Sequence, residues 1–314
     1  MFEQFFVLFM LIGFGVLAGR LGGIDTIRNE GVGKLLLQVA TPALLFTSTL
    51  SLDMQGGVLM EFIIMSALCF GWFFLFTILA LVFTRLSKTP QHLRSMVIVS
   101  LASSNNGFMG FPIAIAFFGE KGLLLMVAHN LVMNILLFTV GIYLFRGSAD
   151  EKQKRRAIDI AQQMFNLNIT AVFLGIGLSL AGGAHWIEGP VMTVLGMLAA
   201  SAIPLSMMYI GITLSASHPV ALLRDGMTVQ ASLIRLTAFP VITFLLCLLL
   251  PMPPEMKQIL FVTAMLPTAA SVPVLTGIYA KTTTQKATRI VLFSTVLSLI
   301  TAPLGVWIAT AVFS

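Results

Sequence analysis

Long apolar segments recur along the whole chain and limit its possible folds more than any other feature. A helix of about 20 apolar residues spans the hydrocarbon core of a bilayer, and segments of about that length alternate here with short polar connections. Only 10% of the 314 residues are charged, against about 25% in soluble domains. The sequence therefore predicts an all-α polytopic membrane protein. Ten transmembrane helices are predicted at residues 3–19, 33–51, 58–84, 95–119, 122–145, 164–182, 190–214, 230–250, 257–280 and 287–313.

The basic residues are distributed unevenly between the predicted loops. Of the 18 Lys and Arg residues, all except Lys121 and Lys257 lie in or next to loops on one side of the membrane, whereas the acidic residues divide evenly. Basic residues concentrate on the cytoplasmic side of membrane proteins. We therefore expect both termini outside the cytoplasm. The formal charge of +6 reflects this topology and does not indicate a nucleic-acid partner.

A hydrophilic stretch divides the ten predicted helices into five and five. It covers residues 147–163, so that residues 1–146 form a first repeat and residues 164–314 a second, joined by a cytoplasmic linker. Because five is odd, the two halves enter the membrane from opposite sides, and common ancestry would make them an inverted repeat.

Proline positions support the repeat. Pro42 in the second helix corresponds to Pro204 in the seventh, and Pro112 in the fourth corresponds to Pro273 in the ninth, at nearly the same displacement. Proline is common in membrane helices, so a single match carries little weight. Two matches at one displacement favour an inverted repeat.

The fourth and ninth predicted helices carry helix-breaking residues at their centres, in "NNGFMGFP" and "LPTAASVP". Proline removes an amide donor and clashes with the carbonyl four residues earlier, and glycine weakens a helix further. We expect an unwound segment near residues 105–111 and a second between Pro267 and Pro273. Simple proline kinks, which neighbouring helices can stabilise, are the alternative interpretation.

Unwound backbone inside a membrane survives only where protein or water surrounds it, so two such breaks predict a central cavity. Half-helices that begin near the two matched prolines would direct their amino termini at that cavity, and helix amino termini bind anions. Uncharged side chains nearby can add hydrogen bonds. The predicted substrate-binding residues are Asn105, Asn106, Gly107, Pro112, Asn130, Asn134, Pro267, Thr268, Ser271 and Pro273.

Other polar residues inside the predicted helices have two interpretations each. Asn130 and Asn134 lie one turn apart on one face, where they can reach a cavity or form hydrogen bonds between helices. His129 can handle a proton or simply pack. Arg235 can attract or gate an anion, or extend to the interface. No Asp or Glu occupies the centre of a predicted helix, which argues against an intramembrane carboxylate relay.

The chain resembles the auxin efflux carrier family, in its branch of bacterial carboxylate carriers. The resemblance rests on the ten predicted helices, the hydrophilic centre, and the motifs "VATPALLF", "NNGFMGFP" and "LPTAASVP" followed by "GIYAK". Asn105 matches the family's binding asparagine, and Pro112 and Pro273 match its crossing-point prolines. The long central loop of many plant members is missing, and the proline spacing in the ninth helix differs from that of some.

The resemblance implies an inverted-repeat transporter in a bacterial inner membrane. Helices 1, 2, 6 and 7 would form a scaffold, with a homodimer through the scaffold helices, and helices 3–5 and 8–10 would form a transport domain that moves as an elevator.

We therefore expect a secondary active or facilitative transporter of small organic carboxylate anions, similar to malonate or malate. A sodium-coupled carrier of the bile-acid type and a membrane ligand sensor that does not transport are the alternatives. The coupling ion is H⁺ or Na⁺, and uniport stays open. The sequence lacks HExxH, an intramembrane aspartate pair and a P-loop, so we expect no enzyme, no cofactor and no metal site.

Overall fold

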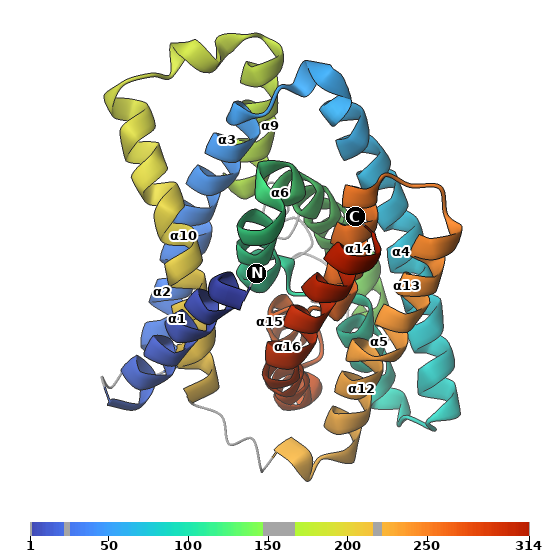
Figure 1. The fold of residues 1–314 in the computed structure, drawn as a ribbon. Coiled ribbons are helices and arrows are strands. Elements are labelled where there is room, and N and C mark those ends of the chain that lie inside the picture. The colour runs from blue at the N-terminus through green and yellow to red at the C-terminus, as the bar shows by residue number, and fades with distance from the viewer. Residues whose placement is uncertain (1, 22–25, 147–166, 216–221, 314) are drawn as a thin grey trace. The chain divides into compact units, whose positions relative to one another are not determined.

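The computed structural model describes residues 2–21, 26–146, 167–215 and 222–313. These residues are nearly all helical, and their only extended pairing is a bridge between Ser104 and Thr268. They divide into two compact units, each of which can be followed in Figure 1. Unit 1 contains residues 1–64, 108–127 and 165–217, and unit 2 contains residues 65–107, 128–164 and 218–314.

Seven helical runs in the described part of the chain are long and apolar enough to cross a membrane. They are Phe2–Leu21, Asn29–Ser51, Leu59–Leu86, Asn106–Phe145, Pro190–Ser215, Gly226–Leu249 and Lys281–Val312. These apolar helices make a multi-pass membrane protein, but the predicted ten-helix repeat is not confirmed. The number is smaller because the fourth and ninth predicted helices are interrupted, the described part of the sixth is only 14 residues long, and residues 106–145 form one run despite a kink within it.

Unit 1 is built mainly from helices α1 (Phe2–Leu21), α2 (Thr26–Leu35), α3 (Thr41–Ser51), α9 (Leu167–Leu180) and α10 (Pro190–Ser215). It also contains the turns η1 (Leu36–Ala40), η2 (Met54–Val58) and η6 (Gly183–Trp186). Helix α10 packs along α1 and also contacts α2 and α3, while α3 packs on α9. The segments predicted as helices one, two, six and seven all fall in this unit. The division into five-helix repeats stays a prediction.

Glycines set how closely α1 and α10 approach. A Cβ atom on Gly15 would collide with the backbone of Met208, and one on Gly211 with the backbone of Ile12. Gly15 and Gly19 stand four residues apart, the spacing that lets membrane helices pack backbone to backbone. Close packing replaces the hydrophobic driving force that lipid does not provide, so these glycines hold the helix pair together.

Helix α6 (Phe111–Leu136) contains a sharp kink at Gly119, where φ is 66° and ψ is −162°. An L side chain rarely adopts this positive φ, whereas glycine adopts it readily. The kink falls where the fourth predicted helix ends, so α6 consists of two helices joined without a loop. The boundary between units lies further along, between Val127 and Ala128.

Unit 2 is built from most of α4 (Leu59–Leu86), the end of α6, and a set of helices at the carboxyl side of the chain. These elements are α5 (Gln91–Ala102), η3 (Asn106–Gly110, largely in unit 1), η4 (Leu137–Gly141), α7 (Ile142–Arg146), α12 (Gly226–Leu236), α13 (Ala238–Leu249), α14 (Pro254–Met265), α15 (Ser271–Tyr279), η7 (Lys281–Thr283) and α16 (Thr284–Val312). Helix α16 is central to the unit, because α5, α12, α14 and α15 all pack against it.

The eighth predicted helix is divided in two at Thr237, whose φ of −126° and ψ of −65° are not helical. The cause lies three residues later, because the ring of Pro240 clashes with a carbonyl one turn earlier. The prediction of one continuous helix over residues 230–250 is therefore wrong in this detail.

An ion pair joins the start of α12 to α16. Lys286 Nζ lies 2.8 Å from Asp225 Oδ1, and Arg289 Nη1 lies 3.6 Å from Asp225 Oδ2. Burial alone would raise the pKa of the Asp225 carboxyl, but the hydrogen bond and charge of Lys286 outweigh it and lower that pKa below its ordinary value. The folded state therefore favours the ionised carboxylate.

Stability should depend on this carboxylate only in acid. A depressed folded pKa contributes stability that is present above the unfolded pKa of about 4 and is lost as the pH falls through the folded value. Asp225→Asn should cost about 1 kcal/mol or less at pH 7, and the difference from wild type should shrink as the pH falls below about 4. Thermal unfolding across pH measures it, and a constant difference at every pH would contradict it.

Candidate functional site

The first helix break lies just after α5. Ser103 has φ −108° and ψ 143°, so the chain is extended directly after Ala102. The hydroxyl groups of Ser100 and Ser103 donate to the carbonyls of Met96 and Val99, at 2.7 and 2.8 Å. Such side-chain bonds compete with helical ones, and the serine and asparagine run that follows favours a non-helical backbone.

This break occupies residues 103–105, so the prediction of unwinding near residues 105–111 was placed a few residues too late. The π-helical turn Asn106–Gly110 continues directly into α6. Pro112 is the second residue of α6 and follows this π-helical turn directly, so it lies inside the helical run Asn106–Phe145. Pro112 therefore does not mark the unwound residues.

The second break lies between α14 and α15. Leu266 is extended, with φ −78° and ψ 154°, because a residue before proline avoids the helical region and Pro267 follows it. Pro273 lies in the first turn of α15, where proline is tolerated. The interruption between Pro267 and Pro273 agrees with the sequence prediction, although the chain is helical again from Ser271.

The two breaks pair with each other inside unit 2. Ser104 and Thr268 form an antiparallel bridge, and the amide of Asn105 donates to the carbonyl of Pro267 at 2.9 Å. The hydroxyl of Thr268 donates to the carbonyl of Ser100 at 3.0 Å, and its amide to the hydroxyl of Ser294 at 3.2 Å. Backbone groups released by one break thus find partners at the other, which allows both breaks to persist away from water.

A chain of side-chain hydrogen bonds leads from the first break to α6. Ser104 Oγ donates to Asn106 Oδ1 at 2.9 Å, and Asn106 Nδ2 lies 2.8 Å from His129 Nδ1. An amide nitrogen can only donate, so His129 Nδ1 accepts and neutral His129 carries its proton on Nε2. Met133 completes the group, since its sulfur accepts from the amide of Ser104 at 3.2 Å.

Arg235 lies next to both breaks. It is 1% exposed, so it does not extend to the membrane interface. Its Nη1 donates to the carbonyl of Ala264 at 2.8 Å, its Nη2 to Thr263 at 3.3 Å and its Nε to Ser103 at 3.4 Å. All three acceptors belong to the ends of the interrupted helices α5 and α14. The guanidinium group therefore contacts both breaks at once.

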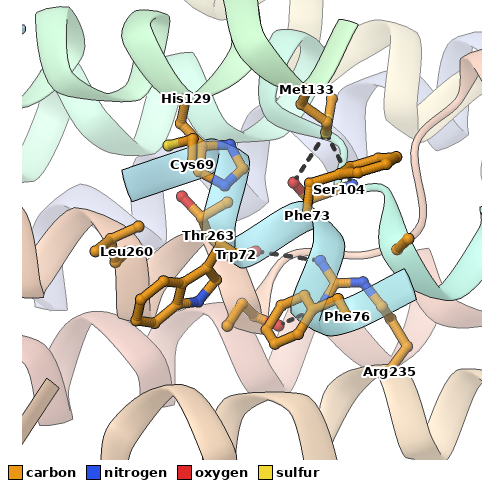
Figure 2. A pocket seen from close by; sticks show the side chains of 12 residues that line it. Cys69, Trp72, Phe73, Phe76, Ser104, His129, Met133, Arg235, Leu260 and Thr263 are labelled. Carbon is orange, nitrogen blue, oxygen red and sulfur yellow. Dashed lines mark hydrogen bonds between the residues drawn. The ribbon is translucent and has the colours of Figure 1, made fainter. Parts of the chain in front are cut away.

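A small cavity separates Arg235 from His129, as Figure 2 shows. It encloses about 10 Å³, about the space that one water molecule requires. Ser104 and Met133 close one side, and apolar side chains of α4 close another. The lining residues are Cys69, Trp72, Phe73, Phe76, Ala102, Ser104, His129, Met133, Arg235, Leu260, Thr263 and Ala264. They include no Asp or Glu, so the only formal charge at the cavity wall is positive.

The structure brings several predicted site residues together. Asn105 and Asn106 are buried beside Thr268 and Pro267. Gly107 follows in the π-helical turn, while Ser271 and Pro273 open α15.

The other three predicted residues all belong to α6. Asn130 and Asn134 are only half-buried on α6, in unit 2, and Pro112 belongs to unit 1. Sequence reasoning missed Cys69, Trp72, Thr263 and Met133, which carry no local signal because apolar helices contain such residues throughout. In the described part of the chain no three His, Cys, Asp or Glu residues cluster to hold a metal ion.

Comparison with known proteins agrees with a membrane carrier. The family described as "Membrane transport protein" matches residues 1–307. An uncharacterized transporter of Methanocaldococcus jannaschii is 27% identical over 305 residues, which cover 93% of this chain and 95% of the relative. An uncharacterized transporter of Methanothermobacter thermautotrophicus is 26% identical over 208 residues, which cover 66% of this chain and 65% of the relative, just under two thirds of its length. The chain belongs to the membrane transport protein family, which is also the auxin efflux carrier family.

Proposed function

We propose that this protein carries small organic carboxylate anions, similar to malonate or malate, across a bacterial inner membrane. The observation that supports this most is the pairing of two interrupted helices in unit 2 beside a cavity without an acidic side chain. Uncharged donors and helix termini attract an anion without the tight hold of a direct ion pair. A carrier needs such a site, because it must release what it binds.

Asn105 and the amino terminus of α15 are the proposed contacts for the carboxylate. The backbone amide of Asn105 donates to the carbonyl of Pro267, and α15 begins at Ser271, four residues after Pro267. The first turn of a helix has amides without helical partners and a partial positive charge. Asn106 and Thr268 position this region, since their side chains bond to its backbone and to Ser104.

We further propose that unit 2 is the part that moves in an elevator mechanism and that unit 1 is the scaffold. Each unit is compact by its own contacts, and the proposed substrate contacts all lie in unit 2. A homodimer through the scaffold helices, the external termini, and H⁺ or Na⁺ as the coupling ion stay predictions.

Uptake into liposomes tests the substrate and the site together. Purified protein should take up labelled malonate or malate, and Asn105→Ala should lower kcat/KM by about 10- to 100-fold, because losing a hydrogen bond to a charged ligand costs about 1.5–3 kcal/mol. Asn105→Asp should lower uptake further, because its negative charge repels the anion.

Gln91→Ala is the matched control, since Gln91 is an exposed amide at the opposite end of α5. It should leave uptake unchanged. If no carboxylate in a broad panel is taken up, the substrate proposal fails. If a carboxylate raises the unfolding temperature but no flux follows, the protein is a ligand sensor.

A further inference from the structure

Arg235 is the largest side chain among the fully buried ones in unit 2, yet no acidic residue in the described part of the chain pairs with it. A buried charge is costly unless it is paired or hydrogen-bonded. The structure must therefore compensate the positive charge in another way.

The compensation comes from the carboxyl-terminal ends of two helices. Thr263 and Ala264 lie in the last turn of α14, and Ser103 directly follows α5. Carbonyls in the last turn of a helix lack most of their helical partners, although that of Thr263 also accepts from the amide of Leu266 at 3.3 Å. Each helix end carries about half a negative charge. Two ends therefore balance about one guanidinium charge. Because Nε, Nη1 and Nη2 each donate to a different carbonyl, the planar fork of Arg235 also fixes the two ends relative to each other.

We propose that Arg235 is a tethered cation that fills a cation-binding place between the two interrupted helices. In other carriers with broken helices, the carbonyls at half-helix carboxyl ends coordinate a coupling ion such as Na⁺. Here the guanidinium group donates to the corresponding carbonyls and takes the place of a free ion. Arg235 is thus a positioning residue for the paired breaks, and Na⁺ has no place between them in the wild-type protein.

Removing the side chain should convert this place into an open cation site. Arg235 lines the small cavity, so the space left by Arg235→Gly joins a volume that already accommodates about one water. The carbonyls of Ser103 and Ala264 would lose the guanidinium donor, and that of Thr263 would keep only the amide of Leu266. Guanidinium or Na⁺ should bind there and stabilise the folded state by mass action.

Thermal unfolding of the detergent-purified protein without substrate tests this proposal. Arg235→Gly should lower the unfolding temperature by about 5–10 °C, because it leaves buried carbonyls without donors. Millimolar guanidinium or Na⁺ should restore at least half of that loss, whereas choline, which cannot enter, should not. Arg235→Lys should lose less than Arg235→Gly, because the ammonium keeps the charge without the fork. Wild type should gain less from Na⁺, relative to choline, than Arg235→Gly does.

Arg94→Gly is the matched control. Arg94 also donates to a backbone carbonyl, that of Thr89 at 3.0 Å, but it is exposed, and neither cation should restore its loss selectively. The proposal is overturned if Arg235→Gly responds to neither ion, or if Na⁺ over choline stabilises wild type as much as it stabilises the variant. A variant that folds in neither cation counts as no response and overturns the proposal as well. Because no substrate is present, failure of the carboxylate proposal would leave this result unaffected.

Discussion

Gly211→Leu should prevent purification of a folded, monodisperse protein, or lower its unfolding temperature by about 10 °C or more. A Cβ atom at Gly211 would collide with the backbone of Ile12, and with Gly15 Cα at 2.8 Å. A flexible side chain could move aside, but these are backbone atoms of α1. Overpacking typically costs about 1–3 kcal/mol, occasionally more, and here α1 and α10 would have to separate along their contact.

The control substitution lies on the same helix. Gly196 also belongs to α10, but a Cβ atom there would meet nothing within 4 Å. Gly196→Leu should therefore unfold within about 2 °C of wild type, since helix propensity favours leucine over glycine. Size-exclusion chromatography and thermal unfolding in detergent measure both variants. Equal behaviour of the two would show that α1 and α10 do not pack as closely as the structure places them.

Asn106→Leu should lower stability by about 2–4 kcal/mol, because it leaves His129 Nδ1 without its partner and Ser104 Oγ with only the weak acceptor Met133 Sδ at 3.4 Å. Asn106 is fully buried, and its amide joins Ser104 Oγ to His129 Nδ1. Hydrogen bonds in membrane proteins average only about 0.6 kcal/mol where the unfolded chain finds other partners. Here leucine removes both hydrogen bonds of Asn106 and cannot donate to His129 in its place. The estimate of about 2–4 kcal/mol therefore applies. Thermal unfolding should shift by about 5–10 °C.

A double-mutant cycle separates this hydrogen-bond loss from a change in packing. His129→Leu alone should also destabilise the protein, but adding it to Asn106→Leu should cost less than the sum, because the unpaired imidazole is then gone. Asn134→Leu is the control, since Asn134 is only half-buried and takes no part in this chain of bonds. Strict additivity of the two substitutions would contradict the described coupling between Asn106 and His129.

The membrane class and both helix interruptions were predictable because their causes are local. Apolar length decides that a segment can span a bilayer, and Pro267 acts on the residue immediately before it. The kink between the fourth and fifth predicted helices likewise coincides with a glycine. The first break lies earlier than expected, because Ser103 and Asn105 leave the helix before the next helical run begins at Asn106, whereas the prediction rested on the glycines and Pro112.

The roles of Arg235 and Asn106 depended on contacts that the sequence does not encode locally. The carbonyls that Arg235 contacts lie some 30 residues after it and more than 100 before it, so only folding shows that they meet. The same holds for the pairing of Ser104 with Thr268 and for the glycines between α1 and α10. The sequence alone determined where helices form and where they break, through side-chain chemistry within one turn. The tertiary structure decided which broken ends meet and which buried groups compensate them, because those partners are distant in the chain.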